Sequence, residues 1–363
     1  MTHQIPRLIL LDDSWLAKIN PEFIRFNEIK NWSVERQISV FWKLVREHVF
    51  KEHPEMSEEK IDKSMQAFNT AYWLVKYKFQ DIERNTGWRY FDHLVRVMQY
   101  LVINSKTPTI KKTIIALCHD IIEDTDVDFN TLKSIFWSYI ALAVLIISKK
   151  PIKFFIEDKK DIEKFIDIKE TWILNSKWLI SDEFLQKRTY FSSSVTEEEK
   201  KALELFNDLE NKLKEKRSEE YFSHMLSHSN IFINKIWDNT PCLNQFYDNA
   251  LLLTLNVNLN IRLSKEEIKE VCLDALEVKF WDRIDNLRTT EIYENFTYDN
   301  YKKAQRKIVE TEKYFYKIAL EFDNLIWTNF YNLIFSEVEK LKNFILFKSK
   351  VLVKDDVWEI IAK

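Results

Sequence analysis

Ionisable side chains gather in residues 119–126, which read HDIIEDTD. If this stretch is helical, His119 and Glu123 lie one turn apart, as do Asp120 and Asp124, so the four polar groups share one face. Grouping carboxylates beside a histidine is electrostatically unfavourable unless a cation neutralises them. The stretch therefore favours a metal site, and its alternative is a helix C-terminus with acidic residues facing solvent.

Two other stretches carry candidate metal ligands. In WDRIDNLRT, Asp282 and Asn286 are four residues apart within an apolar helical pattern, so the carboxylate is expected to be paired with an arginine, to act as a cap or to bind a metal. In RNTGWRYFDH, His93 lies one turn into an expected helix. Its alternative is an ordinary core or surface histidine.

Gly87 is the only glycine of the chain and lies between two expected helices. We expect the first helix to end at Arg84 and the chain to reverse there, so that His93 points toward the other candidate ligands. Glycine is the residue best suited to a positive φ after a helix end. A single glycine also excludes the P-loop and the dinucleotide fingerprint, which need at least two. A phosphate would be held by a metal, by Arg and Lys side chains or by helix N-termini.

Composition and charge indicate no nucleic-acid or membrane partner. The formal net charge of −3 gives no general attraction to polyanions. Cys118, Cys242 and Cys272 lack CxxC spacing, so they predict neither a disulfide framework nor a zinc knuckle. The N-terminal RLILLDD is too short for a signal peptide, and the apolar stretch 135–147 is shorter than a membrane span and is expected to be a buried helix. We therefore expect a soluble cytoplasmic protein.

The hydrophobic pattern predicts a chain that is nearly all helix, because apolar residues recur at spacings of three and four and prolines are few. The expected helices cover residues 57–84, 90–103, 108–125, 128–136, 135–147, 264–293 and 299–320. Ser57 and Ser264 are the expected N-caps of two of them.

The motifs occur in an order that resembles the hydrolase domain of the RelA/SpoT family, HD-type phosphohydrolases that degrade the alarmones (p)ppGpp. The family pattern is R-x-S-G-x-x-Y-x-x-H, then H-D-x-x-E-D-T, then V-S/T-K, then D-R-x-x-N-x-R-T. This chain supplies RNTGWRYFDH, HDIIEDTD, VLIISKK and WDRIDNLRT in that order. The resemblance implies an all-α HD-domain helical bundle, with a large helical insertion between the second motif and the helix of the last metal ligand.

The resemblance also implies roles for individual residues. One divalent cation, typically Mn²⁺, would be held by His93, His119, Asp120 and Asp282. Imidazole and carboxylate ligands also suit iron, cobalt or zinc. Glu123 and Asp124 would orient the attacking water and handle its proton. The residues implied to bind the nucleotide substrate are Arg84, Asn85, Thr86, Lys149, Asn286 and Thr289. Arg84 would stack on the base, whereas Asn286 and Thr289 would form hydrogen bonds to the nucleoside, that of Asn286 to the ribose.

Three features depart from the family pattern. Asn85 replaces the usual lysine after the arginine, and Leu94 replaces the usual proline after the first histidine. The insertion at 151–264 is much longer than the family's link, and its His224 and His228 are expected to form an ordinary helix face and not a second metal site. Only about forty residues follow the last matching helix, so we expect no synthetase domain.

The expected organisation has four parts: an N-terminal helical extension at 1–55, a hydrolase domain at 56–150 and 265–330, the insertion at 151–264, and a C-terminal helix or tail at 331–363. The sequence does not determine the oligomeric state, and a homo-oligomer is one of the alternatives.

The leading functional interpretation is a metal-dependent pyrophosphohydrolase that removes the 3′-pyrophosphate of (p)ppGpp, yielding GDP or GTP and pyrophosphate. A second interpretation keeps the metal site but assigns another phosphorylated nucleotide, such as an adenosine alarmone or NADPH, because of Asn85 and the insertion. A third is a catalytically retired HD protein that senses a nucleotide. The presence of both Glu123 and Asp124 argues against this third interpretation.

Overall fold

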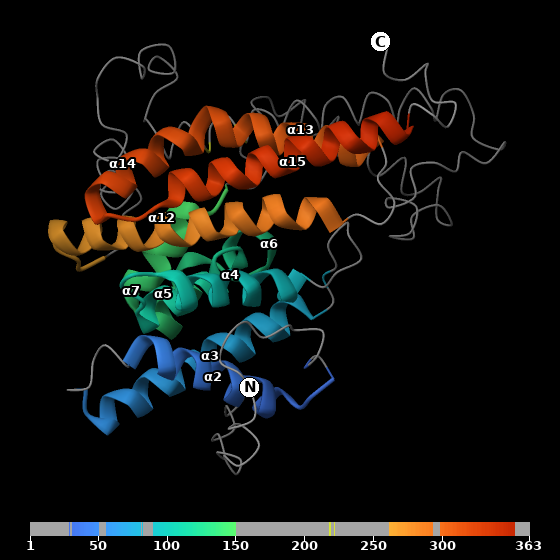
Figure 1. Cartoon of the computed structure of the whole chain (residues 1–363). Coiled ribbons are helices and arrows are strands. Elements are labelled where there is room, and N and C mark those ends of the chain that lie inside the picture. The colour runs from blue at the N-terminus through green and yellow to red at the C-terminus, as the bar shows by residue number, and fades with distance from the viewer. Residues whose placement is uncertain are drawn as a thin grey trace, which may run out of the picture. The chain divides into compact units, whose positions relative to one another are not determined.

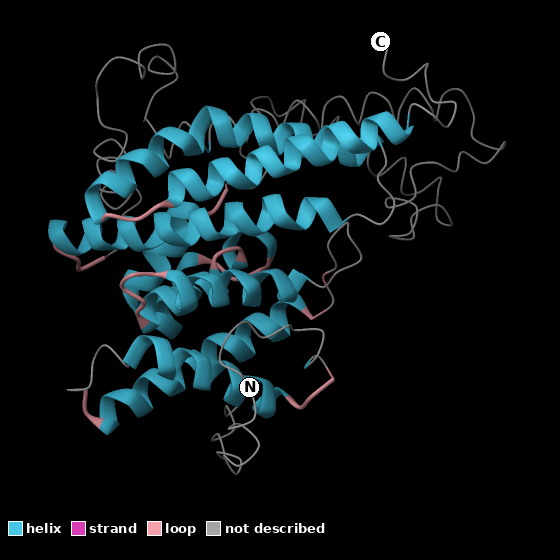
Figure 2. Ribbon diagram, viewed as in Figure 1, coloured by secondary structure: helices cyan, strands magenta, loops and turns pink. Residues whose placement is uncertain are grey.

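The structure is a computed structural model that describes residues 29, 31–50, 56–80, 82, 90–149, 218, 221, 261–292 and 298–352 (Figure 1). Helices make up 86% of this part of the chain, and this part contains no strand (Figure 2). The all-α class predicted from the sequence is therefore confirmed.

Contacts divide the chain into two compact units, residues 1–148 together with 226–363, and residues 149–225. In the second unit, the ammonium of Lys149 lies 5.4 Å from the ring centroid of Tyr221. The paired histidines His224 and His228 of the predicted insertion, and Cys242, lie outside the described residues. All helices named below belong to the first unit.

The described part of the first unit starts with two helices and a π-helical turn, followed by a group of four helices. The order is α2 (Val34–Val45), η2 (Arg46–Phe50), α3 (Glu58–Phe79), α4 (Tyr90–Asn104), α5 (Ile110–Cys118), α6 (Ile121–Asp124) and α7 (Phe129–Ile147). After the second unit come α12 (Lys265–Arg288), η4 (Thr289–Ile292), α13 (Tyr298–Glu310), η5 (Thr311–Phe315), α14 (Tyr316–Ile326) and α15 (Phe330–Leu352).

Helix α12 is the central element of this unit. It packs against α4, α5 and α7 on one side and against α15 on the other, as Figure 1 shows. Helix α3 packs against α4 and α5 on the side away from α12, and α2 packs against α3. Because α12 has neighbours on both sides, its apolar residues are buried around its circumference, among them Val271, Leu276, Phe280 and Ile284.

The start of α12 is fixed by a reciprocal cap. The Ser264 hydroxyl accepts a hydrogen bond from the backbone N–H of Glu267 at 3.1 Å, and the Glu267 carboxylate accepts one from the backbone N–H of Ser264 at 2.7 Å. Two otherwise unpaired donors are thereby satisfied. The predicted N-cap at Ser264 is confirmed, and Ser57 is likewise the N-cap residue of α3, although its hydroxyl makes no capping hydrogen bond.

The predicted single helix over 108–125 is wrong. Helix α5 ends at Cys118, and α6 begins at Ile121 after a turn in which Asp120 has φ −103° and ψ 2°. Neighbouring residues on a continuous helix point about 100° apart, so an unbroken helix would separate the side chains of His119 and Asp120. The turn lets both approach the same point.

Helix α7 is the one described helix that is long and apolar enough to cross a membrane, with a mean hydropathy of 1.6 over 18 residues. The helix is thus longer than the apolar stretch 135–147 expected from the sequence. More than half of this window is buried inside the protein, where α7 packs against α12 and α5. Trp137, with φ 66° and ψ 159°, also kinks the helix. This kink agrees with the two adjoining helices predicted over 128–147.

Candidate metal centre

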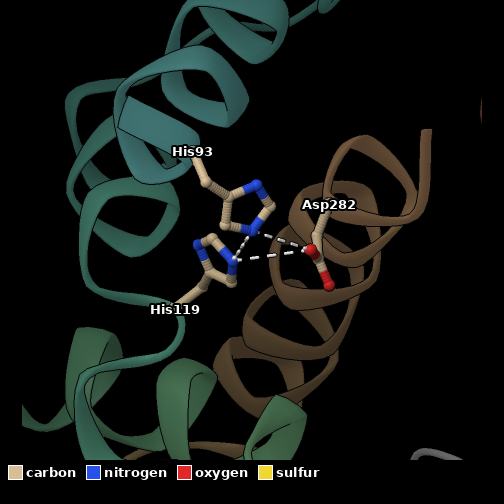
Figure 3. Close-up of side chains that lie close together, drawn as sticks. All are labelled: His93, His119 and Asp282. Carbon is tan, nitrogen blue, oxygen red and sulfur yellow. Dashed lines mark hydrogen bonds and ion pairs between the residues drawn. The ribbon is translucent and has the colours of Figure 1, made fainter. Parts of the chain in front are cut away.

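Four ionisable side chains from distant parts of the sequence meet in the first unit. His93 comes from α4, His119 and Asp120 from the turn between α5 and α6, and Asp282 from α12. Figure 3 shows the two imidazoles and the Asp282 carboxylate directed toward one another. The sequence predicted these four as metal ligands, and the structure brings them together.

The distances between the ligand atoms are short. The Nε2 atoms of His93 and His119 are 3.3 Å apart. His93 Nε2 lies 3.1 Å from Oδ1 of Asp282. His119 Nε2 lies 3.1 Å from Oδ2 of Asp120. All four side chains are buried, and the two histidines are 0% exposed.

The outer nitrogen of each imidazole already has an acceptor. His93 Nδ1 lies 2.6 Å from a carboxylate oxygen of Asp285, and His119 Nδ1 lies 2.7 Å from the backbone carbonyl of Ala116. A carbonyl and an ionised carboxylate only accept hydrogen bonds, so each Nδ1 carries the proton. In the neutral rings, both Nε2 lone pairs therefore face the interior of the cluster.

Two lone pairs and two carboxylates at such distances repel one another unless a positive charge lies among them. Two imidazole nitrogens with carboxylate oxygens are ligands that borderline divalent cations accept. The hydrogen bonds to both Nδ1 atoms are also the kind of support that metal-binding histidines have. The buried group of His93, His119 and Asp282 could therefore hold a divalent metal ion.

The electrostatics of the cluster agree with this requirement for positive charge. Burial acts to lower the pKa of His119, but the charge and hydrogen bonds of Asp120 and Asp282 outweigh it and raise that pKa to about 10. Burial acts to raise the pKa of Asp282, yet the Lys279 ammonium and hydrogen bonds from both histidines hold it well below its usual range. A proton on His119 thus supplies the positive charge when no metal competes for the site.

Two further side chains of α12, those of Lys279 and Asn286, bind the Asp282 carboxylate. The Lys279 ammonium lies 2.8 Å from Oδ2 of Asp282, and the Asn286 amide donates to Oδ1 at 2.5 Å. The motif resemblance implies that Asn286 binds the ribose of a nucleotide. In the structure its amide positions the Asp282 carboxylate.

The predicted catalytic carboxylates adjoin the cluster through Tyr90. The Tyr90 hydroxyl lies 2.6 Å from Oδ2 of Asp124 and 2.8 Å from Oδ2 of Asp120. Asp124 is exposed and Glu123 is half-buried, both on α6. One hydroxyl thus links a predicted ligand of the cation to a carboxylate that solvent can reach.

The predicted nucleotide-binding residues are only partly described. Arg84, Asn85, Thr86 and the glycine between the helices, Gly87, lie outside the described residues. Lys149 belongs to the second unit. The hydroxyl of Thr289 donates to the backbone carbonyl of Asp285 at 2.7 Å, at the end of α12.

Four residues that support the cluster were not predicted from the sequence. No role was expected for Asp285, Arg96 or Lys279, and Tyr90 was expected only as part of a motif. Each of the first three lies three residues from a predicted ligand on the same helix, a spacing that puts side chains on one face. That spacing places the three side chains near the predicted ligands but does not show which residues they contact.

No protein-family model matches the chain, no curated protein matches it, and no solved structure matches it.

Proposed function

We propose that this chain is a metal-dependent phosphohydrolase of the HD type, with the 3′-pyrophosphate of (p)ppGpp as its substrate group. The observation that carries the proposal is the convergence of His93, His119, Asp120 and Asp282 on one buried point with both histidine Nδ1 atoms already hydrogen-bonded. An ion pair alone would need only one imidazole, whereas here the Nε2 atoms of two imidazoles face the same oxygen of Asp282.

These four side chains would hold the cation, and the surrounding residues would keep them in place. A bound divalent cation would lower the pKa of a water molecule and stabilise negative charge on a phosphate oxygen. Lys279 and Asn286 fix the Asp282 carboxylate, which limits the ways in which it can rotate. The ligand set is therefore arranged before a cation binds.

The chain also offers a proton acceptor beside the cluster. Asp124 shares the Tyr90 hydroxyl with Asp120, so its carboxylate is close to the cation ligands without being one of the closely grouped atoms. Glu123 is the adjacent half-buried carboxylate. In the proposed hydrolysis, these two acids orient the attacking water and accept its proton, as a general base must do from hydrogen-bond distance.

The choice of substrate rests on the motif resemblance and on one contact. The backbone N–H of Tyr90 donates to the carbonyl of Ile82 at 3.0 Å. Ile82 and Tyr90 are therefore joined directly, and Tyr90 also touches Asp120. The implied base-binding Arg84 and its neighbours fall between these two residues in the sequence. This supports a nucleotide bound next to the cluster.

The test is hydrolysis by the full chain supplied with Mn²⁺. We expect pyrophosphate and GDP from ppGpp, and we expect Asp282→Asn to lower the rate at least 100-fold, because it weakens a ligand of the cation. Glu266→Gln, which changes an exposed carboxylate at the start of the same helix, is the matched control and should leave the rate unchanged.

A panel of nucleotides separates the alternatives. Orthophosphate from NADPH, or hydrolysis of an adenosine alarmone without hydrolysis of ppGpp, would replace the proposed substrate. Tight nucleotide binding with no turnover of any nucleotide would contradict the enzymatic proposal and favour a nucleotide sensor.

A further inference from the structure

Helices α4 and α12 meet through two matched pairs of side chains. His93 and Arg96 lie three residues apart on α4, and Asp282 and Asp285 lie three residues apart on α12. His93 contacts both aspartates, with Nε2 3.1 Å from Asp282 and Nδ1 2.6 Å from Asp285. Arg96 reaches the same Asp285 carboxylate with Nε at 2.7 Å and a terminal nitrogen at 3.0 Å.

We propose that Asp285 is a positioning residue that orients His93 as a metal ligand, and that Arg96 holds Asp285 in the orientation this requires. The inference rests on the metal site of the proposed function. It adds two residues to that site that do not touch the cation.

The geometry gives Asp285 this role because an ionised carboxylate cannot donate a hydrogen bond. Its contact with His93 Nδ1 therefore fixes the proton on that nitrogen and leaves the Nε2 lone pair for the cluster. The same bond fixes the rotation of the ring about its side-chain torsions. A carboxylate in this position is known to strengthen the metal-binding nitrogen of a histidine.

The Arg96 guanidinium keeps the buried Asp285 carboxylate ionised and fixes its orientation. The Asp285 side chain is 1% exposed, so its charge needs a partner. The planar guanidinium binds both carboxylate oxygens, and this two-point contact allows one orientation of the carboxylate plane. The oxygen shared with His93 is thereby directed at Nδ1.

The two histidines are supported differently, and this difference supplies an internal control. His119 Nδ1 donates to the backbone carbonyl of Ala116, a contact that no side-chain substitution removes. Only the His93 side of the site depends on a side-chain carboxylate. Changes at Asp285 should therefore affect His93 and leave the hydrogen bond of His119 unchanged.

The experiment is a Zn²⁺ titration of the full-length chain, combined with NMR of the imidazole Nδ1–H protons in protein labelled at histidine. We expect Asp285→Asn to weaken Zn²⁺ binding by about 10- to 100-fold. We also expect it to shift the His93 Nδ1–H signal upfield while the His119 signal stays in place. A purely structural role would not move one of these signals alone.

Two further variants show whether a loss of affinity comes from misfolding. Asp285→Asn leaves the Arg96 guanidinium without its carboxylate. The double variant Arg96→Gln with Asp285→Asn removes both charges, and it should show the same loss of Zn²⁺ affinity and the same selective shift of the His93 signal. Glu266→Gln on α12 is the control and should bind Zn²⁺ like the unaltered chain.

The outcomes separate this inference from the proposed function. Unchanged Zn²⁺ affinity with an unmoved His93 signal in both Asp285 variants would overturn the role of Asp285 and leave the metal site intact. Failure of the unaltered chain to bind Zn²⁺ would overturn the metal site and this inference together.

Discussion

The two imidazoles at the centre of the cluster face each other across a short gap. Their Nε2 atoms are 3.3 Å apart, and each nitrogen on the far side of its ring is already a donor. In the metal-free chain, the raised pKa of His119 means that a proton supplies the positive charge. A metal ion must displace that proton in order to bind.

This competition predicts the pH dependence of metal binding. The folded-state pKa of His119 is about 10 and exceeds the unfolded value, so protonation stabilises the metal-free fold fully below about pH 6.5 and ceases to do so as the pH rises through 10. Mn²⁺ affinity should therefore rise about tenfold per pH unit between pH 6 and pH 8. Mn²⁺ titrations at three pH values and constant ionic strength measure this pH dependence of the dissociation constant. Equal dissociation constants at pH 6 and pH 8 would contradict the account.

At the residue scale, the sequence predicted the closely grouped metal ligands but not the residues that position them. Spacing and the motif resemblance identified His93, His119 and Asp282. The role of Asp285 depends on a hydrogen bond to a residue 192 positions away in the sequence, and local spacing does not contain that information. The same holds for Arg96, which forms its bonds to Asp285 across the contact between two helices.

At the scale of elements, the break between α5 and α6 builds the site. Sequence periodicity favoured one continuous helix there, because the apolar residues keep their spacing through the break. In the structure, the turn at His119 and Asp120 directs two consecutive side chains to one point. The partners of His119 and Asp120 lie on α4 and α12, which a local sequence pattern does not contain.

The contact between α4 and α6 can be tested at Tyr90. Tyr90→Phe keeps the ring, which stacks on Phe79 with centroids 5.1 Å apart, and removes the hydroxyl shared by Asp120 and Asp124. We expect a loss of about 1 kcal/mol in the free energy of unfolding, typical of one hydrogen bond. Because the hydroxyl orients Asp120, Mn²⁺ affinity should also fall by about tenfold.

Urea unfolding and Mn²⁺ titration measure these two effects. The control is Tyr77→Phe, which removes a hydroxyl from a tyrosine that is 65% exposed on α3. If Tyr90→Phe bound Mn²⁺ as tightly as the control, the hydroxyl would have no part in arranging the cluster.

At the scale of the molecule, the site depends on the packing of the whole first unit. Its ligands span positions 93 to 282 and come from α4, from the turn after α5 and from α12 itself. On its other side, α12 is held by aromatic contacts, including those of Phe280 with Phe322 at 5.1 Å and with Phe330 at 5.0 Å. The sequence predicted the all-α class and the convergence of the last ligand helix. It did not predict how the C-terminal helices support α12.

Because the ligands converge only in the folded chain, metal binding should stabilise the fold. At a Mn²⁺ concentration of 100 times the dissociation constant, the free energy of unfolding should rise by about 2.7 kcal/mol. Urea unfolding with Mn²⁺ and with a chelator measures this gain. Asp282→Asn should lose most of it, whereas Glu266→Gln should keep it. An equal gain in Asp282→Asn would mean that the ion binds elsewhere.

The most direct test is the position of the ion itself. Crystals of the full chain grown with Mn²⁺, with diffraction data collected near the manganese absorption edge, would locate the ion by its anomalous scattering. The account predicts one strong peak about 2.2 Å from Nε2 of His93, Nε2 of His119 and a carboxylate oxygen of Asp282. A fully occupied Mn²⁺ site elsewhere, with no peak between the two imidazoles, would contradict it.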